Sequence, residues 1–141
     1  MLTNEEIVHK AAQLRIPLRG VYSKDLLPSK LQPGAYVINL ENSDAGGGSH
    51  WTCFIVKQRG PSFYFDSFGM PPPRKVQELI PDCIWSTTDI QNINDGHCGW
   101  FCLAFLYWIT RRGGTMNSFL RLFSDDVTQN RSVLMTLLKK V

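Results

Sequence analysis

The chain has 141 residues, of which 43% are hydrophobic and 19% are charged, and its formal net charge is +3. This composition excludes a disordered tail or a low-complexity linker, and the small net charge gives no argument for a nucleic-acid-binding protein. The length suits one domain with a core that needs no disulfide or metal. We therefore expect a single domain over residues 1–141, acting as a monomer.

The first half of the chain predicts one helix followed by strands. Apolar residues recur at i, i+4 and i+7 over 5–14, Thr3 and Glu6 match a capping box, and Pro17 ends the helix. Residues 21–34 resemble a loop. β-Branched and aromatic residues predict strands over 35–40, 51–56 and 62–66, and turn residues around Gly60 join the last two into a hairpin.

The second half is mainly helical. A short helix is expected over 74–80, a strand over 83–90, a strongly apolar helix over 99–110, and amphipathic helices near 117–123 and 129–139. Helices flanking a mostly antiparallel central sheet give the fold class α+β.

The cellular setting is inferred from the chain start, the apolar runs and the cysteines. Met1 to Glu6 carry neither the basic nor the apolar region of a secretory signal, so we expect an intracellular protein with reduced thiols. The longest apolar run, Cys98 to Ile109, is too short to span a bilayer and predicts a buried helix, so no membrane contact is expected. Four cysteines occur: Cys53, Cys83, Cys98 and Cys102.

Cys98 is the candidate nucleophile because it lies at the expected N-terminus of the apolar helix. The partial positive charge and the unsatisfied N–H groups of a helix N-terminus stabilise a thiolate, which is a far better nucleophile than a thiol. Taken alone, Cys98 is explained more simply as a small buried apolar residue, because buried structural cysteines are common.

His50 and Asp66 could serve this cysteine as base and orienting acid. A tight turn at Gly60 places Asp66 opposite Cys53, three residues from His50, so the two side chains can meet at one end of the hairpin. A carboxylate that binds one imidazole nitrogen leaves the other to take the thiol proton. The alternatives are a histidine beside a loop and an acid that ends a strand.

Gln91 precedes Cys98 by seven residues, across a polar loop that contains glycine. Such a loop can bring the side-chain amide over the cysteine, where its N–H donors and the Cys98 backbone N–H would converge on a developing oxyanion. The alternative is an ordinary loop glutamine.

These residues, in this order and with their neighbours, resemble the adenovirus-type cysteine proteases (adenain), in the clan with the ubiquitin-like-protein-specific proteases. The resemblance is carried by His50-Trp51, Asp66 with its flanking Phe-Ser-Phe-Gly residues, Gln91, and Cys98-Gly99. It implies that His50 is the general base, that Asp66 orients it, that Gln91 stabilises the oxyanion and that Cys98 attacks.

The resemblance also implies the substrate. The family cuts polypeptides beside glycine, in Gly-X-Gly or Gly-Gly sites, and processes viral structural proteins, which implies capsid maturation inside the host cell, its nucleus or the virion. The alternative function is a ubiquitin-like-protein isopeptidase, and a less favoured one is a non-catalytic module that binds Gly-tailed peptides. The expected substrate contacts are Gly48, Trp51, His97 and Gly99.

Three features depart from the family pattern. Asp66 stands where adenovirus enzymes more often have Glu, His97 stands where the ubiquitin-like-protein proteases have Asp, and the chain is shorter than adenain. Adenain is assisted by a disulfide-linked peptide and by DNA, and Cys83 lies in a context loosely similar to that of its peptide-linking cysteine. An activating peptide or DNA is thus a possible partner implied by the resemblance.

Other interpretations of the same residues are weaker. His50 with Cys53, and Cys98 with Cys102, superficially offer zinc ligands, but residues three apart on a strand face opposite sides. His97 is a poor alternative base, because neighbours on a helix point about 100° apart. The run that ends at Gly48 lacks the Lys-Ser/Thr of a phosphate loop, and it forms either a substrate-pairing rim or a surface loop. We expect no metal and no cofactor.

Overall fold

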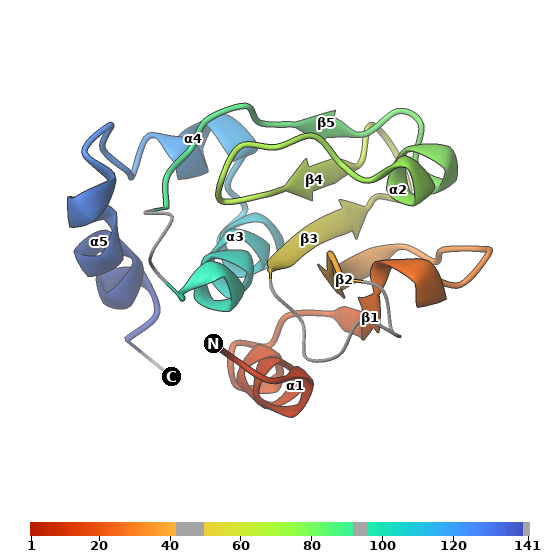
Figure 1. The fold of residues 1–141 in the computed structure, drawn as a ribbon, viewed down its shortest axis with the longest axis horizontal. Helices are drawn as coiled ribbons and strands as arrows, with labels where there is room; N and C mark the ends of the chain where they lie inside the picture. The colour runs from red at the N-terminus through yellow and green to blue at the C-terminus, as the bar shows by residue number, and fades with distance from the viewer. Residues whose placement is uncertain (42–49, 92–95, 140–141) are drawn as a thin grey trace.

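A computed structural model of the protein describes residues 1–41, 50–91 and 96–139. Within them, the chain forms a five-stranded sheet in the order β1-β2-β3-β4-β5, which runs from the bottom to the top of Figure 1. The strands are β1 (Leu18–Ser23), β2 (Gly34–Asn39), β3 (Trp51–Val56), β4 (Phe63–Phe65) and β5 (Ile84–Trp85). The α-helices are α1 (Asn4–Gln13), α2 (Arg74–Leu79), α3 (Cys98–Thr110), α4 (Met116–Leu120) and α5 (Asn130–Leu137). Short 3-10 helices lie at Lys24–Leu26 (η1) and Val127–Gln129 (η3).

The α+β class is as expected, but the sheet is mixed rather than mostly antiparallel. β2, β3 and β4 pair antiparallel, whereas β1 pairs with β2 and β4 pairs with β5 in parallel. The parallel β1–β2 pair was not expected, because residues 21–34 resembled a loop. The segment that connects β1 to β2 includes Leu27. This residue is buried in one cluster with Tyr36 of β2 and Phe54 of β3, so the segment covers one face of the sheet.

Both faces of the sheet are buried at β2, β3 and β4, and successive residues of these strands face different cores. Cys53 and Ile55 of β3 face a large cluster that contains α3 and parts of α1, α4 and α5. Phe54, between them, faces a smaller cluster that includes residues of α2. Burial on both faces explains why β2 and β3 have nearly continuous apolar sequences.

Helix α3 is the centre of the larger core. None of its residues is exposed, and Phe105 stacks on Phe65 of β4 with ring centroids 4.7 Å apart. Phe119 of α4 packs edge-on against both rings. This aromatic group joins the helix that begins at Cys98 to the strand that ends before Asp66.

Several element boundaries differ from those expected. The capping box of Thr3 and Glu6 is present, but α1 ends at Gln13 through Arg15, whose φ is +59°, before Pro17 is reached. The strand expected over 83–90 is only two residues long, Ile84–Trp85. Within the described part of the chain, no helix combines the length and the apolar character needed to cross a bilayer.

Truncation of Phe105 should destabilise the protein strongly. The side chain is fully buried between two aromatic rings, so Phe105→Ala should lower the free energy of unfolding by about 3–5 kcal/mol. Val8→Ala is the control, because Val8 is 50% exposed on α1 and should change stability by less than about 0.5 kcal/mol. Urea denaturation measures both, and equal midpoints for the two variants would contradict this view of the core.

Candidate active site

The candidate residues gather at one end of the sheet. His50 directly precedes β3 and Asp66 directly follows β4, and because these strands are antiparallel both residues lie at the same end. Helix α3 begins there too, since the backbone N–H of Trp51 donates to Cys98 Sγ at 3.4 Å. The segment of His50 and Trp51 thus lies between Asp66 on one side and the Cys98 thiol on the other.

The imidazole of His50 is held by a buried carboxylate. His50 Nε2 lies 2.8 Å from Oδ1 of Asp66, whose side chain is 1% exposed. The same oxygen accepts the backbone N–H of Phe68 at 2.9 Å, and the Phe68 ring stacks on the imidazole at 4.6 Å. The residue opposite Cys53 is Phe65, one residue from the expected partner Asp66, so the predicted register is corrected by one.

The charges around His50 favour the imidazolium form. Burial lowers the pKa of His50, but hydrogen bonds to Asp66 and to Cys98, together with the negative charges of both, outweigh burial and raise the pKa to about 9. With Nε2 bound to Asp66, Nδ1 is the ring nitrogen left to face the thiol.

The same surroundings favour the thiolate form of Cys98. Burial raises the pKa of the thiol, but the hydrogen bond and charge of His50 and the N–H groups of Trp51 and Gly99 outweigh burial and hold the pKa below its ordinary value. Cys98 is the first residue of α3, where the helix dipole acts in the same direction. Both pKa shifts thus favour the thiolate form of Cys98 and the imidazolium form of His50.

Gln91 is also buried at this end of the fold. Its side chain is 1% exposed, and Oε1 accepts a hydrogen bond from the Ser67 hydroxyl. Its backbone N–H donates to Asp89 Oδ1 at 3.1 Å. Ser67 directly follows Asp66, so Gln91 contacts the chain neighbour of the residue that binds His50.

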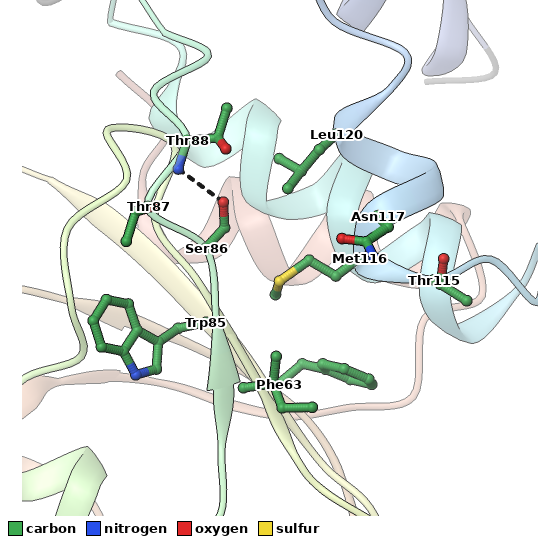
Figure 2. A pocket seen from close by; sticks show the side chains of 10 residues that line it. Phe63, Trp85, Ser86, Thr87, Thr88, Thr115, Met116, Asn117 and Leu120 are labelled. Atoms are coloured by element: carbon green, nitrogen blue, oxygen red, sulfur yellow. Dashed lines mark hydrogen bonds between the residues drawn. The ribbon is translucent and has the colours of Figure 1, made fainter.

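The turn from Asp66 to Gly69 needs glycine at its end. Gly69 has a φ of +74°, and a Cβ built there would lie 2.6 Å from the carbonyl oxygen of Thr87. The segment that contains Thr87 is itself braced by a bond from the Thr88 N–H to Ser86 Oγ, drawn in Figure 2. This segment lines a pocket of about 370 Å³ beside α4 and leads on to Gln91.

The expected substrate contacts have different surroundings. Trp51 is 4% exposed, and its indole N–H donates to the carbonyl oxygen of Leu2 at 2.9 Å. A Cβ on Gly99 would lie 3.2 Å from the Leu2 side chain, so glycine permits this close packing. His97 is the N-cap of α3, and Gly48 lies outside the described residues. Substrate contact by these four residues stays a prediction.

The other three thiols differ from Cys98. All four cysteines are free, and Cys53 and Cys102 are buried together, with Cys53 Sγ 3.8 Å from the Cys102 carbonyl oxygen. Burial raises the pKa of Cys102, and burial with the charge of Asp82 raises that of Cys83. Among the described residues, no group of three or more His, Cys, Asp or Glu side chains could hold a metal ion.

Comparisons with known proteins show a likeness at the level of the fold. No model of a protein family and no curated protein sequence matches the chain. The ASFV pS273R protease has a similar structure, with a TM-score of 0.53 and 19% sequence identity over 71% of this chain and 43% of that protease. The chain thus spans less than half the length of that protease. The central domain of the uncharacterized Lpg1148 protein from Legionella pneumophila matches 94% of this chain and 93% of its own length, with 14% identity and a TM-score of 0.46.

Alkylation should single out Cys98. Because only the thiolate reacts, iodoacetamide at neutral pH should modify Cys98 faster than Cys83, although Cys83 is the more exposed of the two. His50→Ala removes the main group that lowers the Cys98 pKa and should slow this reaction. Peptide mass spectrometry over time measures both effects. Equal rates at Cys98 and Cys83 would rule out an activated thiolate.

Proposed function

We propose that the chain is a cysteine endopeptidase in which Cys98 is the nucleophile, His50 the general base and acid, and Asp66 the group that orients His50. The observation that carries the proposal is the link from the Asp66 carboxylate through the His50 ring to the Cys98 sulfur. The likeness of the fold to a protease supports it further.

In the first half of the reaction, the Cys98 thiolate attacks the carbonyl carbon of the scissile peptide bond. The carbonyl electrons move onto oxygen, where the Cys98 backbone N–H and the Gln91 side-chain amide stabilise the negative charge. The oxyanion then collapses, and His50 gives its proton to the leaving amine. The products of this half are the free amine and a thioester on Cys98.

In the second half, neutral His50 takes a proton from water, which attacks the thioester. The carbonyl oxygen again carries the negative charge and has the same donors. Release of the carboxylic acid product returns the thiolate and the imidazolium. Throughout, the Asp66 carboxylate holds the imidazole and stabilises its charged form.

The substrate class that we propose is a polypeptide with glycine at the cleaved bond, in Gly-X-Gly or Gly-Gly sites, and its source would be viral or virus-like capsid precursors. This part rests on the resemblance of the residues around His50, Asp66, Gln91 and Cys98 to the adenovirus-type proteases. Because the chain spans 43% of the ASFV pS273R protease, no substrate is carried over from that protein.

Cleavage of a degenerate library of glycine-containing peptides tests the proposal. The wild-type protein should cut beside glycine, and Cys98→Ala should abolish turnover because no nucleophile remains. Cys83→Ala is the matched control, since it removes a thiol whose pKa is raised and should keep the activity. Mass spectrometry of the products identifies the cleaved bonds.

The same assay separates the other functions. Preference for folded ubiquitin-like proteins over peptides would favour the isopeptidase. The non-catalytic binding module would be favoured by a protein that binds Gly-tailed peptides but does not cleave them. If Cys98 is still alkylated selectively in that protein, the result contradicts the endopeptidase.

The pH dependence of kcat/KM should follow His50. The reaction needs protonated His50 beside the thiolate, so the rate should fall as the pH rises through about 9. Asp66→Asn removes a charge that raises this pKa, so the falling limb should move to lower pH, and kcat should drop by about 10²-fold through loss of orientation. An unchanged falling limb in Asp66→Asn would contradict the role given to Asp66.

A further inference from the structure

The geometry points to Ser67 as a positioning residue that holds the Gln91 amide with its N–H donors directed toward the reacting carbonyl oxygen. This inference rests on the proposed function and gives a role to Ser67, which the sequence analysis includes only as a neighbour of Asp66 and to which the triad gives no role.

The contact is between two buried side chains. Ser67 is fully buried and Gln91 is 1% exposed, so little water competes for their hydrogen bonds. The Ser67 hydroxyl donates to Gln91 Oε1. The two segments are also joined through the backbone, because the N–H of Ile90 donates to the carbonyl oxygen of Ser67 at 2.9 Å.

The direction of this hydrogen bond determines what Gln91 can do. A glutamine amide has an acceptor oxygen and a donor NH₂ group at similar positions, and rotation by 180° exchanges them. With Oε1 bound to the Ser67 hydroxyl, Nε2 is the end directed away from Ser67. The opposite orientation would present an acceptor oxygen to the oxyanion and repel it. By donating its hydroxyl hydrogen to Oε1, Ser67 holds Gln91 in the orientation in which its NH₂ group can serve an oxyanion.

The position of Ser67 also connects this donor to the base. Asp66, the preceding residue, binds His50 Nε2 at 2.8 Å, and its backbone oxygen accepts the Gly69 N–H at 2.9 Å, which closes the turn. One tight turn thus fixes the imidazole through Asp66 and the amide through Ser67. A displacement of about 1 Å in a catalytic group costs up to about 10² in rate, so a shared rigid support has a large effect.

Kinetics of Ser67→Ala test the inference. We expect kcat on a glycine-containing peptide to fall about 10- to 10²-fold with little change in KM, because the donor acts on the oxyanion and not on the bound substrate. The rate and pH profile of Cys98 alkylation should stay as in the wild type, since alkylation forms no oxyanion. Expressing kcat per Cys98 that is alkylated at the wild-type rate corrects for any unfolded fraction, whose thiol reacts at a different rate.

Ser62→Ala is the matched control. Ser62 is buried, its hydroxyl oxygen accepts the Lys57 N–H at 3.3 Å, and its carbonyl oxygen accepts the Ile84 N–H at 2.7 Å. It thus resembles Ser67 in burial and in its backbone bond to the segment that leads to Gln91, but it lies at the other end of β4. It should keep the wild-type kcat. Ser67→Thr retains the hydroxyl and should keep more activity than Ser67→Ala.

A double-mutant cycle with Gln91→Ala decides whether Ser67 acts through Gln91. If it does, Ser67→Ala should reduce kcat in the wild-type background and have little further effect once Gln91 is alanine. Equal effects in both backgrounds, or a wild-type kcat for Ser67→Ala, would overturn the positioning role while leaving the protease intact. Absence of Cys98-dependent cleavage in the wild type would instead reject the proposed function, and the role of Ser67 with it.

Discussion

The carboxylate of Asp66 is almost completely removed from water, and its charge is satisfied by the His50 ring and the Phe68 N–H. A buried carboxylate without such partners would be strongly unfavourable, so the ring of His50 is held where the charge requires it. The imidazolium that results stabilises a thiolate on Cys98. The chemistry proposed for the thiol therefore depends on how one acid is buried at the end of a strand.

The antiparallel pairing of β3 and β4 is what allows this burial. The pairing brings the start of β3 beside the end of β4. The stacked rings of Phe65 and Phe105 attach β4 to α3. The turn that follows is closed by Gly69, whose tight contact with Thr87 joins it to the segment that carries Gln91. His50, Cys98 and Gln91 are thus positioned by neighbouring parts of one packed unit, although His50 is far from the other two in the sequence.

Much of this arrangement could be predicted from local sequence, and the remainder depends on contacts between distant residues. The strand over 51–56 and the apolar helix that follows Cys98 have strong patterns and were found within one residue. β1 was missed because Arg19 and Gly20 interrupt its pattern, and only parallel pairing with β2 makes it a strand. The hairpin register was wrong by one residue, since the turn at Gly60 admits more than one loop length. A serine after a strand predicts only a turn, so nothing local signalled the partner of Ser67.

The absence of any exposed residue along α3 has a consequence for how the protein responds to heat. Most helices have a polar face and can loosen at one end while the core persists. Here the turn that carries Cys98 is packed against Leu2 and Trp51, so loosening it would expose apolar surface at once. Melting of this turn therefore disrupts the core packing of Leu2, Trp51 and Gly99, whereas fraying of an ordinary amphipathic helix end does not. The sulfur of Cys98 lies within the same packing, so its alkylation rate on heating would report when this part of the core opens.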